Sequence, residues 1–189
     1  MQIYLISHAH TEQVPEVDAD RWVLSQKGKN QSRELAEQPF WSDVDQIVVS
    51  SEQKTFLTIA DIAHSHAIPV WIDSRFDELR RTGWIADYSR QVAEVFANPV
   101  RSVAGWESVD MVRDRALRGL ADLRVRFEGQ TLALVGHGLC LSIIRAEALR
   151  LSQVDFSAWQ RLSFGSFASI GLNPLRLISD FSFSEGALR

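Results

Sequence analysis

Short apolar runs alternate along this chain with stretches in which apolar residues recur at every third or fourth position. The apolar runs predict buried strands over 3–6, 47–49, 68–72 and 131–135, with two closing strands over 167–172 and 175–178. The recurring apolar positions predict helices over 25–38, 52–65, 108–128 and 141–149. Strands that alternate with helices in this way are typical of an α/β sandwich built on a mostly parallel sheet.

Residues 73–106 interrupt this alternation. Gly83, Pro99 and Gly105 punctuate the stretch, and its pattern is irregular. We therefore expect a single domain over residues 1–189, in which residues 73–106 form a lid or insertion. Aromatic residues of this stretch either line a substrate pocket beneath the lid or pack the lid itself; they are Trp84, Tyr88 and Phe96.

Composition and charge narrow the class of protein. Apolar residues make up 46% of the 189 residues and charged residues 23%, as in a folded globular protein. The 24 acidic side chains outnumber the 20 basic ones, which argues against a nucleic-acid partner. The single cysteine, Cys140, cannot form an intramolecular disulfide, which fits the reducing cytoplasm. The apolar stretch at the N-terminus is too short for a signal peptide or a membrane span, so we expect a cytoplasmic protein without membrane contact.

Three polar loops follow predicted strands, at residues 7–11, 50–54 and 136–138. The carboxyl ends of parallel strands meet at one edge of a sheet, where ligands bind in open α/β folds. His8 and His137 lie in two of these loops. Two histidines at one sheet edge can hold one phosphoryl group, the first attacking it and the second donating to its oxygens.

A metal site is the alternative interpretation of these histidines. His8 and His10 are two residues apart, so on an extended strand they share a face, and His137 can then be a third ligand. His64 and His66 lie near a predicted helix end, where residues two apart do not face each other, so we expect both at the surface. The metal content after purification distinguishes this interpretation from the others.

Six segments carry short motifs in a fixed order along nearly the whole chain. They are residues 7–11, 24–32, 50–58, 76–84, 107–115 and 134–138. In turn they resemble Arg-His-Gly-x-Thr, Leu-Thr-x-x-Gly-x-x-Gln-Ala, Ser-Pro-Leu-x-Arg-Ala-x-x-Thr, Leu-x-Glu before Gly and Trp, a Gly-Glu-Ser helix start, and Val-Ser-His-Gly. Together they resemble the histidine phosphatase superfamily, which has the phosphoglycerate mutase-like fold. The resemblance implies a three-layer α/β/α sandwich with a mostly parallel central sheet.

The resemblance also implies a phosphatase that acts on phosphate monoesters through a phosphohistidine intermediate. His8 would attack phosphorus, Glu78 would protonate the leaving oxygen, and His137 would hold a phosphoryl oxygen. The implied phosphate-binding residues are Ser7, Lys54, Thr11 and Gly138. Asp77 is a rival acid, but Glu78 occupies the family position. Neither metal nor cofactor is needed, the partner is a small phosphorylated substrate or a phosphoprotein, and the short chain favours hydrolysis over mutase activity.

Several positions depart from the family motifs close to the expected phosphate. They are Ser7 and Lys54 in place of arginine, Ala9 in place of glycine, and Val14 in place of a frequent asparagine. An arginine fork makes two hydrogen bonds to phosphate, and removing one preorganised donor costs about 10²–10³ in rate. Arg80, Arg81 or His10 would have to supply the missing charge. The alternative function is therefore that of a catalytically degenerate member, which binds a phosphorylated ligand or protein partner without turnover.

Overall fold

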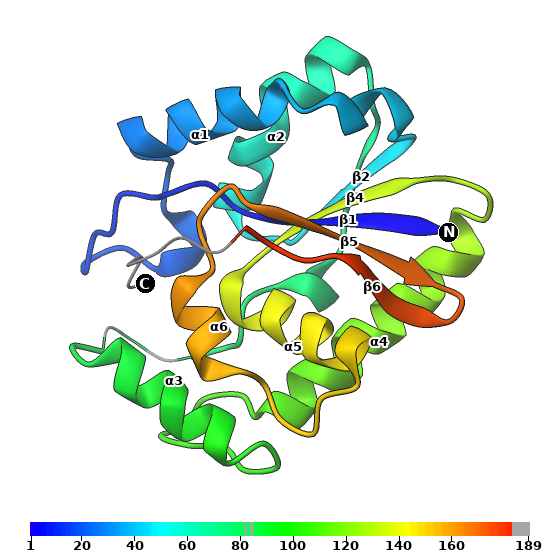
Figure 1. Cartoon of the computed structure of the whole chain (residues 1–189). Helices are drawn as coiled ribbons and strands as arrows, with labels where there is room; N and C mark the ends of the chain where they lie inside the picture. The colour runs from blue at the N-terminus through cyan, green and yellow to red at the C-terminus, as the bar shows by residue number, and fades with distance from the viewer. Residues whose placement is uncertain (82, 84, 183–189) are drawn as a thin grey trace.

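The computed structural model describes residues 1–81, 83 and 85–182 of the chain. Its centre is a six-stranded sheet in the order β3-β2-β4-β1-β5-β6 (Figure 1). The strands are β1 (Gln2–Ser7), β2 (Gln46–Val49), β3 (Val70–Ile72), β4 (Leu132–Gly136), β5 (Phe167–Leu172) and β6 (Leu175–Ser179). Strands β1 to β4 are parallel to one another, whereas β5 runs antiparallel to both β1 and β6. The mostly parallel sheet expected from the sequence is confirmed.

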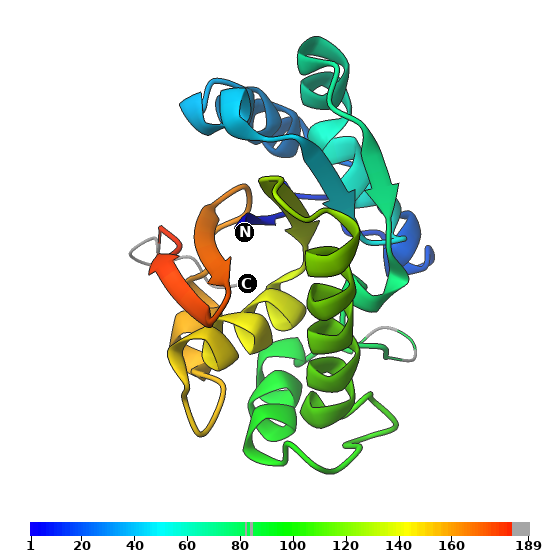
Figure 2. The same cartoon turned by 90° about the vertical axis from the view of Figure 1, so that its right-hand side faces the viewer.

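Helices cover both faces of this sheet (Figure 2). They are α1 (Gln26–Ala36), α2 (Gln53–His66), α3 (Tyr88–Ala97), α4 (Val109–Arg126), α5 (Gly138–Leu149) and α6 (Phe156–Arg161). Figure 1 places α1 and α2 on one face and the other four on the opposite face. Strand side chains alternate between two cores: in β1, Ile3 and Leu5 pack with α4 and α5, whereas Ile6 packs with α1 and α2. The three-layer sandwich is thus confirmed.

Two elements start two or more residues away from their predicted first residue. Strand β3 begins at Val70 rather than at residue 68, because Pro69 has no N–H to contribute to a ladder. Helix α5 begins at Gly138 rather than at residue 141, because glycine conceals a helix start from a hydrophobic pattern. The earlier start places His137 directly before the first turn of α5.

Residues 73–106 contain more regular structure than the sequence indicated. They include the 3₁₀ turn η3 (Ser74–Phe76) and all of α3, whose Val92, Val95 and Phe96 are buried in the core. Neither α3 nor the six-residue α6 was predicted, because such short helices give few repeats of the apolar period. Among the described residues, no helix is both long and apolar enough to cross a membrane.

Candidate active site

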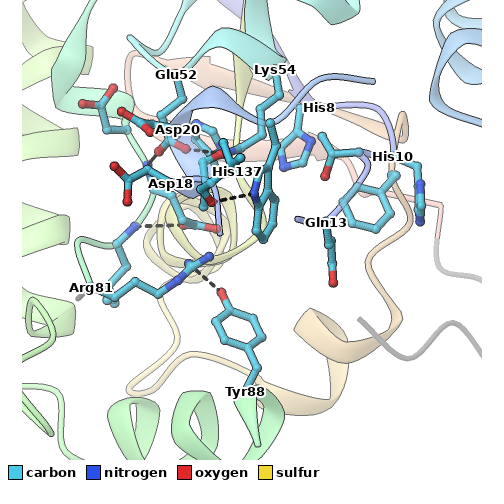
Figure 3. A pocket seen from close by; sticks show the side chains of 18 of the residues that line it. His8, His10, Gln13, Asp18, Asp20, Glu52, Lys54, Arg81, Tyr88 and His137 are labelled. Atoms are coloured by element: carbon cyan, nitrogen blue, oxygen red, sulfur yellow. Dashed lines mark hydrogen bonds and ion pairs between the residues drawn. The ribbon is translucent and has the colours of Figure 1, made fainter. Parts of the chain in front are cut away.

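A cavity of about 1160 Å³ opens beside the carboxyl ends of β1, β2 and β4 (Figure 3). The predicted site residues that line it are His8, Thr11, Lys54, Glu78 and His137. Ser7 and Gly138 are not among the described lining residues: Ser7 is fully buried at the end of β1, and Gly138 is the buried first residue of α5. The structure therefore brings the three predicted catalytic residues into one cavity.

His8 follows β1 directly and is oriented by backbone groups. Its N–H donates to the Gly136 carbonyl at 3.0 Å, which ties it to the end of β4. Its Nδ1 lies 2.8 Å from the Ala9 carbonyl oxygen, and because a carbonyl only accepts, Nδ1 carries the proton of the neutral ring. The lone pair is then on Nε2, the atom that can attack phosphorus. The His8 ring centroid lies 5.2 Å from that of His137.

Helix α1 fixes the loop that carries His8. Gly28 of α1 packs so closely on this loop that a Cβ at its position would lie 2.0 Å from the His10 carbonyl oxygen. Ser25, the N-cap of α1, has its hydroxyl 2.8 Å from His10 Nδ1. The His10 N–H donates to Gln31 Oε1 at 2.9 Å. The second family motif therefore serves to hold the first one in place.

The loop also accounts for two of the departures from the family motifs. Ala9, which replaces the family glycine, is not among the described residues with positive φ, so its side chain is tolerated. Its N–H donates to Thr58 Oγ1 at 2.9 Å. His10 turns toward Ser25, and burial together with the charge of Lys27 lowers its pKa. His10 is therefore a poor replacement for the missing arginine charge.

His137 is completely buried at the end of β4. Its Nε2 lies 2.7 Å from Ser50 Oγ and 3.5 Å from Glu52 Oε1, and its Nδ1 has no hydrogen-bond partner in the described part of the chain. Burial lowers the pKa of His137, although the charge of Glu52 opposes this effect, so the ring is neutral at pH 7. A neutral ring with its proton on Nε2 can donate to Ser50, to Glu52 or to a bound oxyanion.

The carboxylate of Glu52 lies between Lys54 and His137, a position that the sequence motifs do not indicate (Figure 3). Its Oε2 forms an ion pair with Lys54 Nζ, and its Oε1 accepts the Glu78 N–H at 2.8 Å. Lys54 Nζ also donates to the Ala19 carbonyl at 2.6 Å. Burial would raise the pKa of Glu52, but His137 and Lys54 lower it to about 2, so the carboxylate is ionised at neutral pH. The available signal was an acidic residue where the family motif has leucine.

The carboxylate of Glu78, the predicted acid, lies beside the first turn of α5. Its two carboxylate oxygens accept the N–H groups of Leu139 and Cys140, each at 3.2 Å. The N-terminus of a helix favours negative charge at this place. The rival Asp77 is directed elsewhere, because its carboxylate accepts the N–H and the hydroxyl of Ser51 at 2.7–2.9 Å. Of the two carboxylates, Glu78 is thus the one held beside the His137 end of α5.

Arg115 of α4 holds the segment that carries Glu78. Its buried guanidinium makes two hydrogen bonds of 2.9 Å to the Glu107 carboxylate. It also donates to the backbone carbonyls of Arg75, Asp77 and Glu78 at 2.7–3.0 Å. The spacing between Glu107 and Arg115 in the fifth motif thus corresponds to a buried ion pair behind the cavity wall.

Residues 73–106 supply one wall of the cavity, including Arg80 and Arg81. The Arg81 guanidinium stacks 4.8 Å from the Tyr88 ring centroid, and its Nη1 donates to the Tyr88 hydroxyl at 3.1 Å. Tyr88 lines the cavity, whereas Phe96 is buried in the core outside the described lining. Trp84 lies outside the described residues.

Carboxylates and cations both line the cavity. The acidic lining residues are Asp18, Asp20, Glu52, Asp77 and Glu78, and the basic ones are Lys27, Lys54, Arg80 and Arg81. Within residues 1–81, 83 and 85–182, no group of three or more His, Cys, Asp or Glu side chains is arranged to hold a metal ion. The histidines, carboxylates and cations of the lining suit acid-base and phosphoryl chemistry.

Known proteins are similar to this chain in sequence and in fold. The profile of the histidine phosphatase superfamily (branch 1) matches residues 3–173. Phosphoserine phosphatase 1 of Hydrogenobacter thermophilus is 28% identical over 180 residues, which cover 87% of this chain and 82% of that protein. The mycobacterial glucosyl-3-phosphoglycerate phosphatase superposes with a TM-score of 0.78 at 19% identity, over 98% of this chain and 99% of the other. Phosphoserine phosphatase of Entamoeba histolytica, in complex with 3-phosphoglyceric acid, gives 0.76 at 18% identity, over 97% and 98%. At these identities, the two structures show a shared fold.

Proposed function

Because the chain belongs to the histidine phosphatase superfamily, we propose that it hydrolyses small phosphate monoesters through a phosphohistidine on His8. The fixed orientation of His8 carries this proposal. The Ala9 carbonyl holds the ring proton on Nδ1, so Nε2 keeps its lone pair in a cavity that His137 and Glu78 also line. This is the tautomer that an attacking imidazole needs.

The reaction proceeds in two steps. In the first, His8 Nε2 bonds to phosphorus, the bond to the ester oxygen breaks, and Glu78 gives that oxygen a proton. In the second, Glu78 takes a proton from water, the water oxygen bonds to phosphorus, and the bond to His8 breaks. His137 and Lys54 stabilise the charge on the phosphoryl oxygens in both transition states. No metal or cofactor takes part.

Phosphoserine is the first substrate to test, because of the likeness to a phosphoserine phosphatase. The lining supports a substrate that carries charged groups of its own, since it offers carboxylates such as Asp18 as well as Arg80 and Arg81. Residues 73–106 act as the lid over this substrate, with Arg81 and Tyr88 on its inner side.

Binding of a phosphorylated ligand without turnover is the second candidate function. Two observations favour it. Ser7 replaces a family arginine and lies buried, outside the described lining of the cavity. Lys54, the remaining cation of the motif, is engaged by Glu52 and by the Ala19 carbonyl.

Hydrolysis of para-nitrophenyl phosphate and phosphoserine, with a chelator present, distinguishes the two functions. We expect turnover by the wild type and a loss of about 10³-fold or more in His8→Ala. His64→Ala, an exposed position on α2, is the matched control and should keep the wild-type rate. Full turnover in His8→Ala would exclude the phosphohistidine step. Phosphate binding without turnover in all three proteins would support the second candidate.

A further inference from the structure

The Glu52 carboxylate uses the groups that a phosphoryl oxygen would need. Lys54 Nζ pairs with Glu52 Oε2, His137 Nε2 lies 3.5 Å from Glu52 Oε1, and the Glu78 N–H donates to the same oxygen. Lys54 and His137 are the side chains assigned above to phosphate oxygens. A phosphate and this carboxylate cannot occupy one set of donors together, and two like charges side by side repel strongly.

The position of Glu52 directly before α2 also indicates that its carboxylate belongs to the cavity. Glu52 is the N-cap residue of α2, where an acidic side chain usually accepts N–H groups from the first helical turn. Within the described chain, the Glu52 side chain makes no such capping bond. It extends instead into the cavity, beside Lys54 and His137 (Figure 3). The carboxylate thus contacts groups of the cavity and does not cap α2.

The surroundings of Glu52 let it move without crossing a packed core. Its side chain is 13% exposed and borders the open cavity. The other charged or titratable groups that line this cavity are His8, His10, Asp18, Asp20, Lys27, Lys54, Asp77, Glu78, Arg80, Arg81 and His137. Of these side chains, Lys54 and His137 are the ones that the Glu52 carboxylate contacts.

We infer that Glu52 is an internal competitor of the substrate phosphate, and that phosphate binds only when the Glu52 carboxylate leaves Lys54 and His137. The inference rests on the proposed phosphatase function, because it concerns the phosphate subsite of that reaction. The residue sets how tightly oxyanions are held: it weakens binding of inorganic phosphate, the product, as well as binding of the substrate.

Calorimetric titration with inorganic phosphate tests the inference directly. Glu52→Gln keeps the shape of the side chain and an oxygen for Lys54, but it removes the negative charge. We expect this variant to bind phosphate about tenfold more tightly than the wild type, or more. Glu34→Gln, an exposed position on α1, makes the same charge change outside the site and should bind as the wild type does. Equal or weaker binding by Glu52→Gln would overturn the inference, as would no binding by any of the three.

A second variant and a turnover assay complete the test. Glu52→Leu restores the residue of the family motif and should also bind phosphate more tightly, and thermal unfolding verifies that both variants are folded. Turnover of phosphoserine is measured on the same proteins. Tighter binding without turnover in any protein would uphold the competitor and reject the phosphatase. Turnover by the wild type with no gain in phosphate affinity in either variant would do the reverse.

Discussion

At the scale of single residues, the charge balance of the site depends on Lys54. Its side chain is only 6% exposed, and its ammonium group is shared by Glu52 and the Ala19 carbonyl. Lysine brings a point charge, whereas the arginine of the family motif brings a planar fork with two parallel donors. The Lys54 ammonium group can therefore pair with the Glu52 carboxylate or with a phosphoryl oxygen, but it lacks the two parallel donors that would bind both.

Lys54→Met should destabilise the protein by about 3 kcal/mol, because it leaves the Glu52 carboxylate buried without a permanent cation. The same substitution in a Glu52→Gln background should cost clearly less, since no charge is then left unpaired. Urea unfolding of the two single variants and the double variant measures the difference. Equal costs in both backgrounds would show that the pair contributes nothing to stability.

The sequence predicted some residues of the candidate site and missed others for a physical reason. His8 and His137 could be identified because each follows an apolar strand, and parallel strands end at one edge of a sheet. Glu52 could not, because its role depends on where His137 and the Glu78 backbone lie, more than 20 residues away along the chain. A single acidic residue in a polar loop does not reveal such contacts.

At the scale of elements, α1 and α4 each hold one part of the site. Helix α1 packs its Gly28 backbone on the His10 carbonyl and so sets the position of His8. Helix α4 uses Arg115 to hold the carbonyls of the segment that ends in Glu78. Neither helix needs to contact the substrate, yet both determine the distance between the nucleophile and the acid.

Gly28→Ala should lower both stability and turnover. A methyl group 2.0 Å from a backbone oxygen forces α1 or the His8 loop to shift, which costs about 1–3 kcal/mol and exceeds the gain in helix propensity. Thermal unfolding and kcat for phosphoserine measure the two effects. Lys29→Ala, on the next and exposed position, should change neither. An unchanged kcat in Gly28→Ala would mean that this close contact does not position His8.

Arg115→Ala should destabilise the fold by about 3–5 kcal/mol, because it leaves the Glu107 carboxylate buried without a partner. It should also lower kcat more than it changes KM, since Glu78 loses its backbone anchor. Arg118→Ala, exposed on the same helix, serves as the control, with a change of no more than about 0.5 kcal/mol. Denaturant unfolding and steady-state kinetics report the two effects separately.

Most elements were predictable from the periodicity of apolar residues, including α4 with its stripe from Val109 to Leu123. Helices α3 and α6 were not, because they are 10 and six residues long and owe their stability to packing on each other and on the core. Such helices are stabilised by tertiary contacts, which a local pattern does not contain.

At the scale of the whole molecule, the α/β sandwich with a mostly parallel sheet followed from the alternation of strands and helices, but the direction of β5 did not. Helix α5 starts at the carboxyl edge of the sheet, and the segment that contains α6 brings the chain back to that edge, where Gly165 N–H donates to the Ser7 carbonyl. Strand β5 therefore starts beside the site and runs antiparallel to β1. This return also places the Phe164 ring centroid 5.3 Å from that of His8.

The stability of the folded chain should fall in acid, with Glu52 as one cause. The pKa of Glu52 is lowered from 4.5 to about 2 in the folded state, so its ionisation stabilises the fold above pH 4.5, and this contribution is lost as the pH falls toward 2. The contribution of Glu52 is therefore larger at neutral pH than at pH 3. The stability difference between wild type and Glu52→Gln in urea should shrink accordingly between pH 7 and pH 3. A difference independent of pH would contradict the assignment.

The position of β4 has a consequence for how the chain folds during synthesis. Strand β4 lies between β1 and β2, although more than 80 residues separate it from β2 along the chain. At about 5–20 residues per second, a ribosome needs several seconds to make that stretch. During this interval β1 and β2 lack the strand that joins them. Since His137 is made directly after β4, the two histidines that follow β1 and β4 cannot come together before the nascent chain can pair its central strands.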